Sequence, residues 1–141
     1  MGGTGLPLTG GCQCGNVRYE IRGEPLQLYV CHCTECRRQS GSAFGMSLQV
    51  RRGDLVLTAG EPAVWERGTD AGNRLACWFC PHCGTRLYHE NNPSRGWATV
   101  KPGSLDRPVD FGAAMHIWTS RALPGFVLPA GAERYPEEPP R

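Results

Sequence analysis

The chain is organised by alternating apolar and polar positions. In the segment at 16–21, "NVRYEI", Val17, Tyr19 and Ile21 alternate with polar residues, a pattern that predicts a half-buried strand. Further strands are expected at 26–30, 43–50, 55–58, 63–67, 74–79, 85–90, 97–100 and 113–119. One or two turns of helix are expected over 34–40, where Gly41 can end them. The pattern therefore predicts a mainly β fold with mostly antiparallel sheets and little helix.

The length of the chain, 141 residues, fits a single domain. Its 19 glycines and 12 prolines indicate a loop-rich fold that needs a cross-link or a metal for firmness. We expect a flexible leader over 1–9, the domain itself over 10–128, and a frayed proline-rich tail over 129–141. The four tryptophans are expected mainly in the core, with one or two on a pocket wall.

Charge and targeting signals narrow the functional class. The formal net charge is only +2, and the basic residues are fourteen arginines and one lysine, so neither nucleic acid nor a membrane surface is an expected partner. The N-terminus lacks a basic segment followed by an apolar one, and no apolar run approaches the roughly 18 residues of a membrane span. We expect a cytoplasmic protein, whose eight cysteines are better explained as metal ligands than as disulfides.

The cysteine spacing divides these residues into groups. Cys12-x-Cys14 is a pair whose thiols share one face of an extended segment. Cys80-x2-Cys83 lies in "CPHCG", where Pro81 and Gly84 suit a turn that folds back around a metal. Two such pairs complete a four-thiolate tetrahedron, which is typical of structural zinc. We therefore assign Cys12, Cys14, Cys80 and Cys83 to a structural zinc site.

Three further cysteines stand together in "VCHCTECRRQSG". Cys31 and Cys33 share a face at the end of an expected strand, and Cys36 lies one turn beyond Cys33. Three thiolates leave the fourth zinc position for water or substrate, as reactive zinc sites do. His32 points the other way. The alternative is a second structural zinc closed by one more ligand, for which the candidates are Cys77, His82, His89 and His116.

At these residues the sequence resembles the glutathione-dependent formaldehyde-activating family, which includes the centromere protein V-type domain. The resemblance is carried in order by "GGCQCGNVRYEI", "CHCTECRRQSGSAF", "FCPHCGTRLY" and, more weakly, "HIW". It implies an Mss4-like β fold with two zinc ions per chain. It also implies a structural zinc at Cys12, Cys14, Cys80 and Cys83, and a catalytic zinc at Cys31, Cys33 and Cys36.

The family's reaction, as the resemblance implies it, is that of a carbon–sulfur lyase that joins a small thiol, glutathione, to a small aldehyde, formaldehyde. Zinc suits this chemistry because it stabilises a thiolate nucleophile or polarises an aldehyde oxygen. Arg37 and Arg38 are the expected substrate-binding residues, since they could attract a glutathione carboxylate. The sequence leaves dimerisation open.

Two departures from the family pattern and two other functions compete with this interpretation. Cys77 is outside the pattern and is either a buried apolar residue, a ligand to the three-cysteine zinc, or a competitor for the place of Cys80. A further tryptophan that the family often carries in its closing segment is absent, with Phe126 at best a substitute. The main alternative is a non-catalytic binding module with two structural zinc ions. A methionine sulfoxide reductase-like redox protein ranks last, because zinc already accounts for seven of the cysteines.

Overall fold

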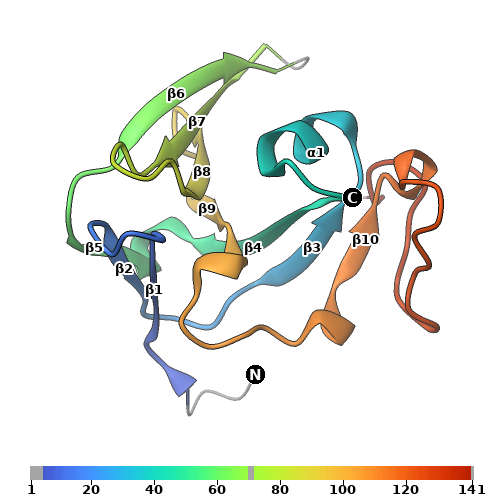
Figure 1. Ribbon diagram of the computed structural model, residues 1–141, viewed down its shortest axis with the longest axis horizontal. Helices are drawn as coiled ribbons and strands as arrows, with labels where there is room; N and C mark the ends of the chain where they lie inside the picture. Colours follow the sequence, from blue (N-terminus) through green and yellow to red (C-terminus); the bar gives the residue numbers. More distant parts are fainter. Residues whose placement is uncertain (1–4, 70–71, 141) are drawn as a thin grey trace.

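The computed structural model describes residues 5–69 and 72–140, and within them it places ten strands and one α-helix (Figure 1). The helix α1, Thr34–Ser40, begins just after the third strand ends. The strands are β1 (Leu8–Gly11), β2 (Arg18–Ile21), β3 (Gln27–Cys31), β4 (Gly45–Arg51), β5 (Leu55–Ala59), β6 (Ala63–Gly68), β7 (Arg74–Phe79), β8 (Arg86–Asn92), β9 (Trp97–Val100) and β10 (Met115–Ile117).

These strands form two sheets. The smaller has the order β1-β2-β5, and the larger has the order β10-β3-β4-β9-β8-β7-β6. All pairings between the described strands are antiparallel except that of β10 with β3, which is parallel. The prediction of a mainly β fold with mostly antiparallel sheets and little helix is confirmed.

The core is built from the alternating apolar positions of both sheets. Tyr19 and Ile21 of β2 are buried while their neighbours are not, and Leu28 and Val30 of β3 repeat the pattern. Alternate side chains of a strand point to opposite faces, so each sheet buries one face and leaves the other for contacts elsewhere. On the second face of the large sheet, Trp65, Cys77, His89 and Thr99 lie opposite one another on β6, β7, β8 and β9.

The first strand was not predicted. Leu8 and Thr9, expected in a flexible leader, belong to β1, whereas residues 1–4 of that leader lie outside the described residues. The sequence "LTGG" has too few apolar residues to show alternation, and it pairs with β2 because its glycines allow a close approach. A Cβ added at Gly10 would lie 2.6 Å from the Tyr19 ring.

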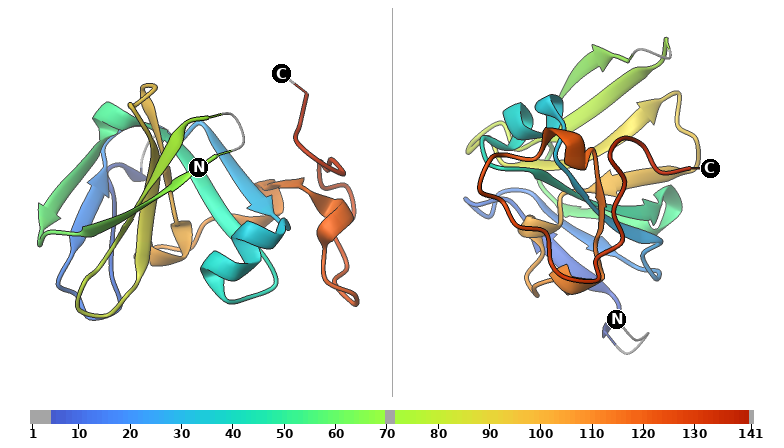
Figure 2. Two further views of the ribbon diagram at one scale, coloured as in Figure 1. Left: turned by 90° about the horizontal axis from the view of Figure 1, so that it is seen from above. Right: turned by 90° about the vertical axis from the view of Figure 1, so that its right-hand side faces the viewer.

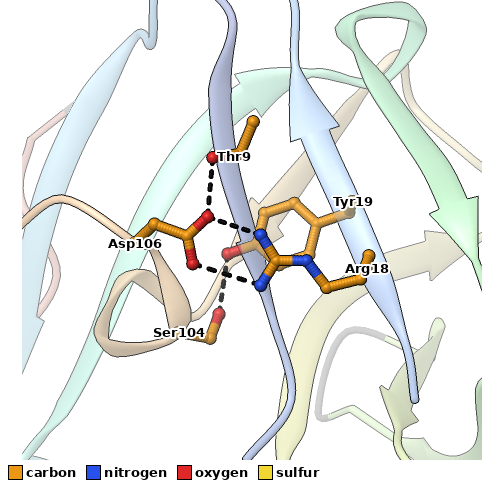
Figure 3. Close-up of polar contacts among 5 residues, drawn as sticks. All are labelled: Thr9, Arg18, Tyr19, Ser104 and Asp106. Carbon is orange, nitrogen blue, oxygen red and sulfur yellow. Dashed lines mark hydrogen bonds and ion pairs between the residues drawn. The ribbon is translucent and has the colours of Figure 1, made fainter. Parts of the chain in front are cut away.

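A polar cluster fastens β1 and β2 to the loop after β9 (Figure 3). The Asp106 carboxylate accepts hydrogen bonds from the Thr9 hydroxyl at 2.6 Å and from Arg18 Nη1 at 3.1 Å. The Arg18 guanidinium lowers the pKa of Asp106. The buried Tyr19 hydroxyl lies 2.7 Å from Ser104 Oγ, and burial raises the pKa of Tyr19 to about 12. These contacts hold the strand that leads directly into Cys12.

The C-terminal segment lies along β10 (Figure 2). His116 N–H donates to the Glu133 carbonyl at 2.9 Å, and Tyr135 N–H donates to the His116 carbonyl at 2.9 Å. The indole N–H of Trp118 donates to Glu138 at 2.7 Å. The expected fraying is therefore not seen between 133 and 138, because the strand edge of β10 binds this part of the chain.

Candidate metal centre and adjoining cleft

Four cysteine side chains converge where the ends of β1 and β7 meet. The sulfur atoms of Cys12, Cys14, Cys80 and Cys83 all lie within 4.8 Å of one another. The Cys12 and Cys14 sulfurs are 3.6 Å apart, and those of Cys14 and Cys80 are 3.8 Å apart. A regular tetrahedron with zinc–sulfur bonds of about 2.3 Å has edges of about 3.8 Å. This group therefore fits a zinc ion.

Tight turns produce this convergence. Gly84 adopts φ +82°, and its N–H donates to the Cys80 carbonyl at 2.8 Å, closing the turn that carries Cys80 and Cys83. Thr85 joins the two halves of the group, because its hydroxyl accepts from Gln13 N–H at 3.1 Å and lies 3.2 Å from the Cys83 sulfur. Hydrogen bonds from Thr85 lower the pKa of Cys83 to about 5, which favours the thiolate that binds metal.

The second cysteine group lies at the junction of β3 and α1. Cys31 is the last residue of β3, Cys33 is the N-cap of α1, and Cys36 is in the first turn of the helix. Their sulfur atoms lie within 4.8 Å of one another. The Cys33 sulfur accepts from Cys36 N–H at 3.4 Å, and hydrogen bonds from the Cys31 and Cys36 thiols lower the pKa of Cys33 to about 2. Both cysteine clusters could bind metal ions, and their all-thiol ligand sets are consistent with zinc.

Contact between α1 and β4 sets the position of Cys36. A Cβ added at Gly45 would lie 3.0 Å from Cys36 Cβ, so the helix packs where only glycine leaves room. The helix ends at Gly41 with φ +64°, as predicted.

Among the described His, Cys, Asp and Glu residues, none joins the three thiols as a fourth ligand. Cys77 is fully buried in β7, where its thiol lies 3.8 Å from the Leu75 carbonyl oxygen and burial raises its pKa. It belongs to neither cluster, so the interpretation of Cys77 as a buried residue is the one that matches its position. His82 and His89 also lie outside the three-cysteine group.

His116 forms a buried pair with His32 instead. His32 Nε2 lies 3.1 Å from His116 Nδ1, the rings stack with centroids 5.3 Å apart, and both residues are completely buried. Burial lowers the pKa of each imidazole. Phe126 packs against His32 with ring centroids 4.9 Å apart. Because His32 lies between Cys31 and Cys33, this pair fixes the backbone that carries two of the three thiols.

A cleft of about 560 Å³ opens beside Cys36, between α1 and the second face of the large sheet. Glu35, Cys36 and Arg38 line its helix side. Its sheet side includes Trp65, Arg67, Arg86, His89 and Lys101. Of the two arginines predicted to bind substrate, Arg38 lines this cleft, whereas Arg37 is not among its lining residues and reaches the Thr34 hydroxyl at 3.4 Å.

The sheet side of the cleft escaped prediction from the sequence. These residues come from β6, from β8 and from the position directly after β9, and the order of these strands in the sheet cannot be read from local patterns. Lys101 offered one signal, since it is the only lysine of the chain. Its ammonium donates to the Met46 carbonyl at 3.1 Å. Trp65 is 53% exposed and lines the cleft, which agrees with the expectation that one or two of the tryptophans form a pocket wall.

Fold and site together define a mainly β protein with two cysteine clusters suited to zinc. The chain belongs to the glutathione-dependent formaldehyde-activating enzyme family, whose family model matches residues 7–121. Among solved structures it is similar to a protein of Rhodobacter sphaeroides from a structural genomics programme. The two share 26% sequence identity with a TM-score of 0.57, and the match covers 73% of this chain and 91% of that one. None of the described helices has both the length and the apolar character needed to cross a membrane.

Proposed function

We propose that this protein is a zinc-dependent carbon–sulfur lyase that forms or breaks the adduct of a small thiol, such as glutathione, with formaldehyde or another small aldehyde. One observation carries the proposal: three cysteine thiols converge without a fourth described ligand, and Cys36 among them lines a cleft of about 560 Å³. A zinc site with three protein ligands and an accessible fourth position is the usual arrangement of reactive zinc.

In this proposal Cys31, Cys33 and Cys36 hold the catalytic zinc, while Cys12, Cys14, Cys80 and Cys83 hold a structural one. Bound zinc would supply a Lewis acid that stabilises a thiolate or polarises a carbonyl oxygen. In the forward reaction the thiol loses its proton, its sulfur bonds to the aldehyde carbon, and the carbonyl oxygen gains a proton. No oxidant or reductant is needed.

The chain's own residues would contribute orientation and charge. The Lys101 ammonium has three donors, of which the structure shows one on the Met46 carbonyl and one, at 3.5 Å, on the Ser47 hydroxyl, so the third can face the cleft and the developing alkoxide oxygen. Holding both reactants in one cleft would add a proximity effect, which matters for a reaction that also proceeds without a catalyst. Arg38 on the helix side would attract an anionic substrate.

Exchange NMR with glutathione and formaldehyde tests the proposal. Zinc-loaded protein should accelerate adduct formation, and Cys33→Ala should remove the acceleration. Cys77→Ala is the matched control, because it removes a buried thiol that belongs to neither cluster and should keep the rate. An uncatalysed rate with protein that carries two zinc ions per chain would refute the lyase and favour the binding module.

A further inference from the structure

The sheet side of the cleft presents positive charge that no acidic residue neutralises. In the described part of the chain the ion pairs are Arg18–Asp106, Arg22–Glu20, Arg52–Glu90 and Arg74–Glu66. None of them includes the cations that line the cleft, which are Arg38, Arg67, Arg86 and Lys101. A single carboxylate, that of Glu35, lines the cleft with them. Even a zinc ion with three thiolates, which carries one formal negative charge, would leave the cleft positive.

Arg86 differs from an ordinary surface arginine because neutral groups hold it in place. Its Nη1 lies 2.9 Å from His89 Nε2, and its guanidinium carbon lies 6.0 Å from the centre of the Trp65 ring. A guanidinium can only donate, so His89 Nε2 must accept and the imidazole proton must be on Nδ1. Burial, together with Lys101, Arg86 and Arg67, lowers the pKa of His89 to about 3, which keeps it neutral. The Arg86 guanidinium is thus held in place by neutral groups, and its positive charge remains available to a ligand.

Arg86 and Lys101 are also accessible from two sides. Both residues line the cleft beside Cys36 and a second hollow of about 740 Å³ that borders Cys83 and Gly103. A ligand that reaches from Cys36 to this junction meets a forked donor from Arg86 and a point charge from Lys101. Carboxylates match this combination, because a guanidinium binds their two oxygens in a bidentate fashion.

We propose that Arg86 determines substrate specificity by binding a carboxylate of the thiol reactant, with His89 and Trp65 as its positioning residues. This inference rests on the proposed function. The charge is assigned to the thiol because the other reactant, formaldehyde, is uncharged and fills little of the cleft. The substrate class is therefore a mercapto acid, of which a peptide thiol with free carboxylates is one example.

Three thiols of similar length but different charge test this inference in the zinc-loaded protein with formaldehyde. We expect kcat/KM for 3-mercaptopropionate to exceed that for neutral 2-mercaptoethanol by about tenfold or more, with cationic cysteamine lowest. Arg86→Gln should remove the preference by raising KM while kcat stays nearly unchanged, since the contact involves a group that does not react. Arg22→Gln, which changes an exposed arginine paired with Glu20, should keep the preference.

Variants of His89 separate positioning from simple charge. His89→Gln keeps an acceptor for Arg86 and should keep most of the preference, whereas His89→Leu should reduce it several-fold. Circular dichroism of each variant verifies that the fold persists. Equal kcat/KM for the three thiols, or a preference that Arg86→Gln leaves intact, would overturn the inference while the lyase function stands.

A binding measurement separates this inference from the proposed function. Glutarate, which cannot form the adduct, should bind wild-type protein more tightly than its neutral analogue glutaramide, and Arg86→Gln should weaken glutarate binding about tenfold. If glutarate binds in this Arg86-dependent way but no thiol is turned over, the lyase proposal fails and the carboxylate subsite stands. Equal affinity for glutarate and glutaramide would overturn the subsite.

Discussion

Replacing Gly45 by alanine should disturb the three-cysteine cluster without touching a cysteine. The added methyl would lie 3.0 Å from Cys36 Cβ and 3.4 Å from the Cys36 carbonyl oxygen. Carbon atoms in contact prefer about 3.5–4.0 Å, so α1 must move away from β4 by roughly 0.5–1 Å. Overpacking of this kind costs about 1–3 kcal/mol of unfolding free energy. The same movement carries the Cys36 sulfur by more than the roughly 0.2 Å within which metal–ligand distances are normally held.

Two measurements follow the effect of Gly45→Ala. Urea unfolding of the zinc-loaded protein should show the loss of stability, and cobalt titration should show altered thiolate-to-metal absorption from the three-cysteine cluster, with the four-cysteine cluster unchanged. Gly53→Ala is the matched control, because a Cβ there meets nothing within 4 Å. It should be neutral or slightly stabilising, by about 0.4–1 kcal/mol. The packing argument is wrong if Gly45→Ala matches Gly53→Ala in both assays.

Three further predictions address the rest of the molecule. Chelation of metal, or Cys80→Ser, should unfold much of the domain, because zinc in such sites contributes on the order of 10–16 kcal/mol to folding. Persistence of the β circular dichroism signal in metal-free protein would contradict this. His116→Phe should cost about 1–3 kcal/mol in urea unfolding by leaving His32 Nε2 buried and unpaired, with partial rescue in His116→Asn; an unchanged midpoint would show that the pair contributes nothing. His89 should make stability fall as the pH drops below about 6.5, because its pKa is lowered to about 3 in the folded state and the unfolded chain therefore binds the proton first. Between pH 7 and pH 5 the wild type should lose about 2 kcal/mol more than His89→Gln, and parallel losses would exclude this cause.

The local pattern of apolar and polar residues predicted most of the strands and the one helix of the fold. Alternation in "NVRYEI" predicted β2 because Val17, Tyr19 and Ile21 fill the core, and the helix over 34–40 matches α1 residue for residue. Alternation could not find β1, where pairing depends on how closely Gly10 approaches Tyr19. It also gave no indication that the C-terminal segment would pair with β10, since that contact depends on a free strand edge elsewhere.

The candidate site was likewise predictable from the sequence only in part. The grouping of the cysteines followed from spacing, because short loops leave few ways to aim a thiol. Spacing did not show that Cys77 stays outside both clusters. That result depends on the strand register, which places Cys77 opposite Trp65 and His89 in the large sheet. The charged side of the cleft could not be predicted either, because Arg86 of β8 and Lys101 after β9 come together only through the pairing of these two strands.

The parallel pairing of β10 with β3 has a consequence for the order of assembly during synthesis. Every ligand of the four-cysteine cluster has been made once residue 83 is complete. The His32 N–H, between two thiols of the other cluster, bonds to the Ile117 carbonyl at 3.1 Å, and β10 in turn is held by Glu133 and Tyr135. Residues made well after the four-cysteine cluster is complete therefore support thiols that were made before it. The four-cysteine cluster can therefore assemble early in synthesis, while the three-cysteine cluster beside the cleft acquires its final geometry only after the chain has been made as far as Tyr135.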